Sequence, residues 1–222
     1  MKKVFHLFTL ALMGLLFTGC FEIVEDIKMN DNGSGLAKVT VNMSESKDDL
    51  ANYMSMEKMN GVKIPSQEEI ERNLERLRKA FAEQPGISDV KIRSDFENFI
   101  FNFDCNFSNL TSFNKAINKV ISKMDRSLGA PPALVHFSQS GGQFKRHFDY
   151  PMPFKKYEDM TFMERFLLES ARFVSIYRFD RPIGKHTNDA AQLSGSKKSI
   201  KLESKLADLV KGTITLRNDI SF

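Results

Sequence analysis

Three histidines supply the imidazole groups of the chain beyond its first twenty residues: His136, His147 and His186. Imidazole can ligate a metal or move a proton near neutral pH. No two of these histidines, and no histidine and cysteine, have the spacing of metal ligands. The Ser140–Gly142 turn does not open a helix, as a phosphate-binding loop would. We therefore expect no metal and no other cofactor.

His147 and Asp149 lie two residues apart, so on a regular strand they would share one face. A carboxylate beside an imidazole can orient it as a general base. The chain has no Gly-x-Ser-x-Gly turn, however, that would present a serine to such a base. We expect no catalytic residue and no enzyme, with a hydrolase whose site is dispersed in the sequence as the least favoured alternative.

The chain contains two cysteines, Cys20 and Cys105. Cys105 follows Phe99, Phe101 and Phe103 at every second position, so it belongs to the apolar face of a predicted strand. Cysteine on such a face behaves as a small apolar residue. We expect Cys105 to be buried and unreactive.

Cys20 ends a segment with a different character. Lys2 and Lys3 begin it, and residues 4–17 are almost wholly apolar. Fourteen residues of helix span about 21 Å, whereas the hydrocarbon core of a bilayer is about 30 Å thick. The order of charge, apolar run and small residues is that of an export signal, with residues 1–19 removed.

Residues 16–20, Leu-Phe-Thr-Gly-Cys, resemble the lipobox of bacterial lipoproteins. The resemblance implies cleavage before Cys20, a diacylglycerol on its sulfur and acyl chains that hold the protein at the membrane. Under the sorting rule of Gram-negative lipoproteins, Phe21 in place of Asp implies the outer membrane if the organism has one. The alternative is an ordinary signal peptide followed by an incidental cysteine.

Charge argues against a nucleic-acid partner. The full chain carries 32 basic and 28 acidic residues. Without Lys2 and Lys3 the basic residues fall to 30, a net charge of +2. Nucleic-acid binding needs a concentrated basic face, and none is evident; short basic pairs occur at residues 145–146, 155–156 and 197–198. They would suit anionic headgroups, but solvated hairpin edges are the simpler interpretation.

Local patterns predict the first elements. Residues 23–29 and 37–43 alternate around the Asn-Asp-Asn-Gly-Ser-Gly turn at 30–35, which indicates a β-hairpin. It starts almost at Cys20, so we expect the domain to lie close to the bilayer. Residues 44–64 predict a loop or weak helix. Ser66 and Glu69 form a capping box ahead of a helix with an apolar stripe at Ile70, Leu74, Leu77 and Phe81.

The rest of the chain continues in the same way. Residues 87–93 and 96–107 predict strands, and Asn109 caps a helix that ends before Gly-Ala-Pro-Pro at 129–132, a possible internal boundary. Hairpins follow at 133–150 and 193–202, a short helix at 160–168, a strand at 171–179, helical turns at 202–209 and a last strand at 213–216. Hairpins between separated helices predict an α+β fold. We expect a single domain, residues 20–222, with a largely antiparallel sheet, two longer helices and one or two short ones.

Three stretches resemble the LppM-like lipoprotein domain: residues 30–41, the Tyr-Arg-Phe-Asp-Arg-Pro-Ile-Gly run at 177–184, and residues 199–209. The resemblance implies an envelope domain involved with lipids.

These patterns together favour a lipid-anchored envelope protein, without enzymatic activity, that binds a partner protein or an apolar or lipid ligand near the membrane. A structural or assembly-accessory lipoprotein without a ligand site is the main alternative. A continuous apolar cavity lined by phenylalanine would favour the ligand-binding hypothesis, and a solid core would remove it. The hydrolase would need His136 or His147 beside a carboxylate or hydroxyl in a cleft.

Overall fold

The computed structural model describes residues 21–59, 62–124, 134–147, 149, 157, 160, 165 and 168–222. Cys20, the possible boundary at 129–132, the basic pair at 155–156 and most of the helix expected at 160–168 lie outside these residues. In the described part the fold is α+β, as predicted, with two main sheets that are mostly antiparallel.

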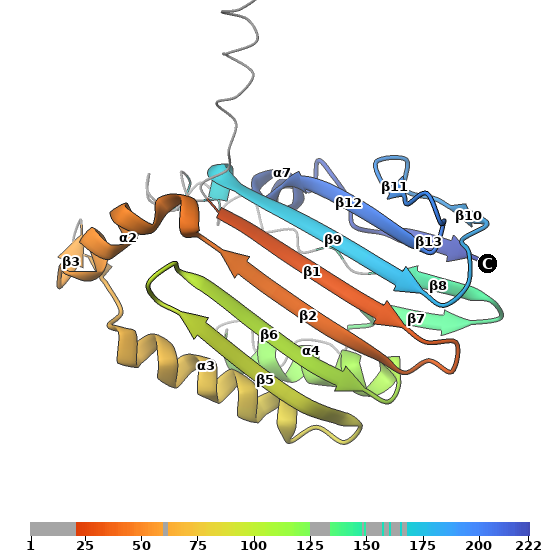
Figure 1. Ribbon diagram of the computed structural model, residues 1–222, viewed down its shortest axis with the longest axis horizontal. Coiled ribbons are helices and arrows are strands. Elements are labelled where there is room, and N and C mark those ends of the chain that lie inside the picture. Colours follow the sequence, from red (N-terminus) through yellow and green to blue (C-terminus); the bar gives the residue numbers. More distant parts are fainter. Residues whose placement is uncertain are drawn as a thin grey trace, which may run out of the picture.

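The larger sheet has seven strands in the order β11-β12-β9-β1-β2-β6-β5 (Figure 1). One pair in it, β1 with β9, is parallel, and the others are antiparallel. The strands are β1 (Phe21–Met29), β2 (Gly35–Asn42), β5 (Ile87–Asp95), β6 (Ile100–Phe107), β9 (Ala171–Phe179), β11 (Gln192–Leu193) and β12 (Ser199–Lys205).

The predicted hairpin is confirmed as β1 and β2. In the turn between them Gly33 has a φ of 83°, which glycine adopts without strain. The side chain of Asn32 accepts a hydrogen bond from the Ser34 backbone N–H, as Asn does in tight turns.

One face of the sheet forms the core. Ile27, Ala37 and Cys105 are paired across β1, β2 and β6, and all three are buried. The opposite face is polar: Arg172 bridges Glu22 and Glu203 on the strands beside it. This is the alternation expected of a sheet with one covered face and one solvated face.

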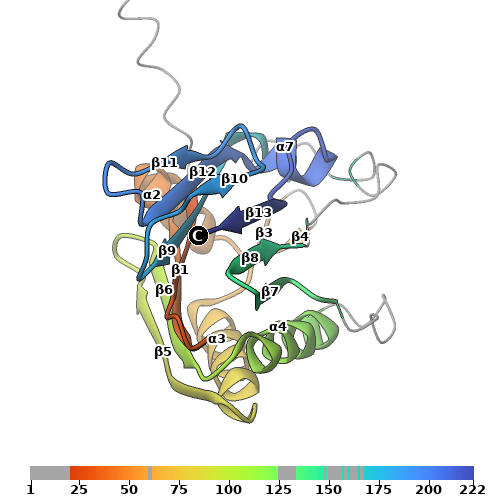
Figure 2. The same ribbon diagram turned by 90° about the vertical axis from the view of Figure 1, so that its right-hand side faces the viewer.

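The two long helices are α3 (Gln67–Ala82) and α4 (Leu110–Met124), and both were predicted. The capping box at Ser66 and Glu69 is present, and Asn109 accepts a hydrogen bond from the backbone of Ser112 at the start of α4. Both helices lie on the core side of the larger sheet (Figure 2).

The second sheet has four strands in the order β10-β13-β8-β7 and lies on the same side (Figure 2). Its strands are β7 (Phe137–Ser140), β8 (Gln143–Arg146), β10 (Lys185–His186) and β13 (Asn218–Ser221). The expected last strand at 213–216 is therefore wrong in position, since the strand follows it. The smaller elements are η1 (Ser44–Ser46), α2 (Lys47–Met54), the β3–β4 hairpin (Lys58–Met59, Val62–Lys63) and α7 (Leu206–Lys211).

Phenylalanine rings join the two sheets and α4. Neighbouring ring centroids lie between 4.7 and 6.0 Å apart along a continuous chain. The chain consists of Phe107, Phe113, Phe137, Phe144, Phe179 and Phe222. These rings pack against one another as part of the core, and Phe107 and Phe137 also contribute to the linings of two open surface grooves.

Candidate functional site

A groove with a largely aliphatic lining lies on the surface of α3 and α4. It has a volume of about 520 Å³, within the range of small-molecule sites. Its apolar lining consists of Pro65, Ile70, Leu74, Leu77, Ala80 and Val120.

The groove exists because the apolar stripe of α3 is longer than the surface that covers it. Phe81 and Ala80 are buried at the end of the helix, and Leu77 packs against the core. Leu74 and Ile70, one and two turns earlier, are only part-buried and lie outside that cluster. The sequence predicted this stripe as a core face, so the groove is a feature that it did not reveal.

Two polar side chains, Asn73 and Arg76, stand at the groove. Arg76 is exposed and donates a long hydrogen bond, 3.4 Å, to the side chain of Asn73. Among the described residues Arg76 forms no ion pair within 4 Å, whereas its neighbour Arg78 is paired with Glu75. A guanidinium group at the rim of an apolar groove suits a ligand with an apolar body and an anionic or polar head.

A second polar group lies inside the molecule, between the two sheets. Arg146 is buried, with its guanidinium 3.9 Å from the carboxylate of Glu25 and 4.4 Å from the ring centre of Phe137. Tyr177 donates a hydrogen bond to Glu25, and burial raises the pKa of its hydroxyl. This cluster holds the sheets together.

His136 joins the same interior. Its Nε2 lies 2.9 Å from the side-chain oxygen of Asn118 on α4, so that nitrogen is the donor. Burial, with a smaller effect of the nearby Arg146, lowers its pKa from 6.5 to about 4. Asn114, one turn earlier on α4, bonds the backbone of residues 136 and 137. His136 is therefore a neutral structural side chain.

His147 lies beside a hydroxyl, as the hydrolase alternative requires. Its Nε2 is 2.6 Å from Oγ of Ser138, which lines a groove of about 500 Å³. A working serine–histidine pair also needs a group that orients the other ring nitrogen. In the described residues we find no such group at His147.

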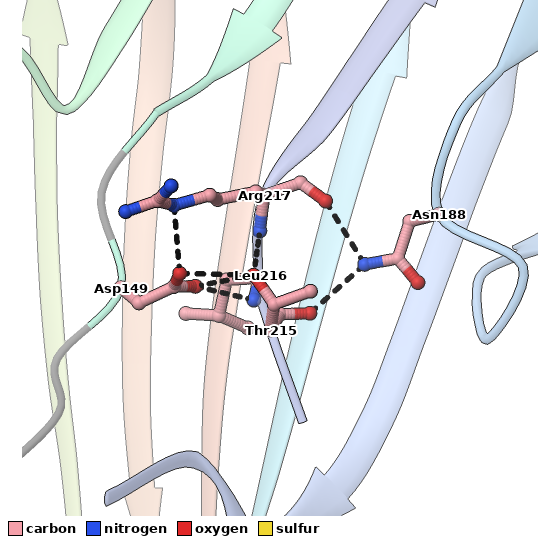
Figure 3. A network of polar contacts seen from close by, with 5 residues as sticks. All are labelled: Asp149, Asn188, Thr215, Leu216 and Arg217. Atoms are coloured by element: carbon pink, nitrogen blue, oxygen red, sulfur yellow. Dashed lines mark hydrogen bonds and ion pairs between the residues drawn. The ribbon is translucent and has the colours of Figure 1, made fainter. Parts of the chain in front are cut away.

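Asp149 is not that group, because its carboxylate bonds elsewhere (Figure 3). It accepts hydrogen bonds from the Thr215 hydroxyl and the Leu216 N–H, and it pairs with Arg217 at 2.9 Å. Asn188 donates to the carbonyls of Thr215 and Arg217 on the other side. The possible pairing of His147 with Asp149 is therefore not seen, and Asp149 instead joins its segment to residues 215–217.

The remaining predicted side chains have structural surroundings. His186 donates from Nδ1 to the carbonyl of Asn188. Cys105 is buried, as predicted, and burial raises the pKa of its thiol to about 12. Within the described residues no three His, Cys, Asp or Glu side chains gather as a metal site.

The two basic pairs within the described residues do not form one cationic surface. In the pair at 145–146, Arg146 is buried and Lys145 is bonded to Asp219. Lys197 and Lys198 lie in the turn before β12. The backbone carbonyl of Lys198 accepts a hydrogen bond from the backbone N–H of Phe179. Phe179 pairs with Met29, at the end of β1 away from Cys20.

Cys20, the predicted lipidation site, immediately precedes the described residues. Phe21, the next residue, is the first of β1. No described helix is long and apolar enough to cross a membrane.

Comparisons with protein-family models and with curated proteins found no match to this chain. A solved structure with some likeness is the folded domain of LppM from Mycobacterium tuberculosis, determined by NMR. The TM-score is 0.40 and the sequence identity 6%, over 91% of this chain and 89% of that chain. A similarity of this size is distant and says nothing of what this chain binds.

Proposed function

We propose that this protein is a lipid-anchored, non-enzymatic protein of the cell envelope that binds an apolar ligand in the α3–α4 groove. The observation that supports a ligand is that Ile70 and Leu74 are only part-buried and line a groove, on the same helical stripe whose last residue, Phe81, is buried. Apolar side chains left along a concave surface are the usual floor of a ligand site.

The ligand that fits this groove best is an acyl chain, since the lining is aliphatic and open along α3. Arg76 would contact the polar head of such a lipid. A helix of a partner protein needs a longer, flatter contact, and a specific interface normally buries more than 1,000 Å² or so in total. A partner protein on this surface is accordingly the second choice.

The groove is tested with the Cys20→Ser protein, which removes the anchor as a source of lipid binding. A fluorescent fatty acid is titrated into this protein and into its Leu74→Lys and Glu71→Lys variants. Leu74 lines the groove, whereas Glu71 is an exposed residue of the same helix outside it. We expect Leu74→Lys to weaken binding about tenfold or more, because it places a charge among apolar atoms, and Glu71→Lys to leave it unchanged. Equal affinity in all three proteins would refute the groove.

The anchor is tested separately by mass spectrometry of the membrane fraction. We expect Cys20 to be acylated and residues 1–19 to be absent, with the outer membrane as the location in a Gram-negative organism. Two or more acyl chains hold a protein on a membrane almost permanently, so Cys20→Ser should release it. An intact Met1 terminus on a soluble product would contradict the anchor.

One contact, between Ser138 and His147, favours the hydrolase as a second candidate function. A fluorophosphonate reagent labels activated serines and tests it directly. We expect no labelling. Labelling that is lost in both Ser138→Ala and His147→Ala would show an enzyme.

A further inference from the structure

The end of the larger sheet at which β1 begins is defined by one row of paired residues. Glu22 of β1 pairs with Asn42 of β2 on one side and with Arg172 of β9 on the other. Arg172 in turn pairs with Lys205 of β12. Asn42 pairs with Ile100, which pairs with Asp95 on β5. Six strands of the sheet therefore begin or end together at the level of Phe21. Figure 1 shows these strands side by side.

Cys20 is joined to this end by a single peptide bond. Consecutive Cα atoms are about 3.8 Å apart, and Phe21 is already paired with Ala171 of β9. A lipoprotein usually has room to turn when a flexible segment separates its lipid from its first strand. Here the lipidated residue directly precedes a central strand of the sheet, so the sheet end cannot move far from the acyl chains.

The surface at this end is built from three elements that follow the row. They are η1 with α2 after Asn42, the Phe96–Phe99 turn between β5 and β6, and α7 after Lys205. The backbone N–H of Met43 donates to the carbonyl of Phe99, which joins the first two.

Apolar side chains reach solvent on this surface. Helix α2 has no buried residue, Met56 beyond it is 47% exposed, and Phe96 in the turn is part-exposed. The charges of η1 and α2 are mostly acidic, with Glu45, Asp48 and Asp49 around Lys47, and Glu97 adds another carboxylate in the turn. The surface therefore suits the boundary between headgroups and acyl chains, where exposed apolar groups are stabilised, and it has no strong preference for anionic lipid.

The opposite end of the sheet is far from the anchor. Eight residue steps of about 3.3 Å separate Phe21 from Met29, about 26 Å along the strand. The 30–34 turn, the Lys197–Lys198 turn and the start of β5 lie there.

We infer that the protein contacts the bilayer through the end of the sheet formed by α2, the Phe96–Phe99 turn and α7, with the strands directed away from the membrane. This rests on the proposed lipid anchor at Cys20. Helix α3 runs against the direction of β5, so its first turns, with Ile70, are on the bilayer side and Ala80 is on the far side. The groove thus opens toward the membrane at its Ile70 end.

Site-specific fluorescent labels test this orientation in the full-length, lipidated protein. Glu97→Cys and Asn52→Cys place an exposed thiol at the proposed contact, and Lys198→Cys places one at the far end. Cys105 is buried, and in the lipidated protein the Cys20 sulfur is already bonded, so neither accepts the label. The labelled proteins are reconstituted in phosphatidylethanolamine–phosphatidylglycerol vesicles that contain a headgroup-spin-labelled lipid as quencher.

We expect strong quenching at residues 97 and 52, none at residue 198, and the same pattern in vesicles without phosphatidylglycerol. Mass spectrometry of each sample establishes whether Cys20 carries its acyl chains. If it does and the three labels are quenched equally, or residue 198 more strongly, the orientation is wrong although the anchor stands. If Cys20 is bare in cells, the anchor itself fails, and the two failures are thereby distinguished.

Discussion

Arg146 of the smaller sheet faces Glu25 of the larger one across the interior, with 3.9 Å between the guanidinium nitrogen and the carboxylate oxygen. The side chain of Arg146 is wholly buried, and that of Glu25 is 15% exposed. The Tyr177 hydroxyl binds the same carboxylate at 2.9 Å. Two sheets that contact mainly through phenylalanine rings are thus also joined by an ion pair, which fixes one relative position of the sheets.

The first prediction concerns this pair. Arg146→Ala should lower the free energy of unfolding by about 3–5 kcal/mol, because it leaves Glu25 without its cation in a largely buried setting. Lys145→Ala, the adjacent residue, removes only an exposed pair with Asp219 and should cost less than about 1 kcal/mol. Urea denaturation of the two variants measures the difference. A loss at residue 146 no larger than that at residue 145 would show that the interior pair contributes little.

The second prediction concerns acid stability and His136. The pKa of His136 is about 4 in the folded protein against 6.5 for the free side chain. Between these values the unfolded chain binds more protons, so stability should fall as the pH falls from 6.5 to 4, by about 3 kcal/mol from this residue. His136→Gln keeps a donor for Asn118 but does not titrate. Unfolding measured at pH 7 and pH 4 should show a smaller loss in this variant, and parallel curves would contradict the prediction.

The third prediction concerns Cys105. Its thiol is buried and its pKa is raised to about 12, and only the thiolate reacts with alkylating reagents. In the Cys20→Ser protein at pH 7.5 or so, we expect iodoacetamide to leave Cys105 unmodified in the folded state and to modify it fully in urea. Mass spectrometry distinguishes the two states. Rapid modification without denaturant would mean that the strand around Cys105 opens readily.

The fourth prediction concerns Gly35, the first residue of β2. A Cβ atom there would overlap the carbonyl oxygen of Lys28 and the ring of Phe107. Gly35→Ala should therefore destabilise the protein by about 1–3 kcal/mol, as overpacking does. Gly195→Ala is the control, because its Cβ would meet nothing within 4 Å. Thermal unfolding of both proteins compares them, and similar melting temperatures would show that the backbone at Gly35 moves aside.

Elements with local signals were predicted well from the sequence. The turn at 30–35, the capping box at Ser66 and the cap at Asn109 each act within a few residues, and each is present in the structure. Cys105 was correctly predicted to be buried, because side chains two residues apart on a strand lie on the same face. The turn at 96–99 was missed and joined to the following strand, because its phenylalanines continue the apolar pattern. Its signal was Asp95, whose carboxylate accepts from the backbone of Glu97 and Asn98.

Features that depend on distant partners could not be predicted. The buried position of Arg146 follows from its alternation with Phe144 on β8, but only once it is known which face of that hairpin is covered. The groove also depends on distant partners. The apolar stripe on α3 has helical spacing, but its residues alone do not determine how much of the stripe other elements cover. The pairing of β1 with β9 joins positions 150 residues apart, such as Glu22 and Arg172.

That parallel pairing has a consequence for how the chain comes to its final state. β1 meets β2 as soon as the short turn between them closes, but its other edge stays open until the chain has been made or delivered as far as β9. During that interval a hydrogen-bonding edge in the middle of the future sheet is exposed to any other extended segment nearby. Glu22, Asp26 and Lys28 on the polar face of β1 would disfavour pairing with an apolar segment. The correct partner, β9, forms ion pairs with this face, from Arg172 to Glu22 and from Arg178 to Asp26.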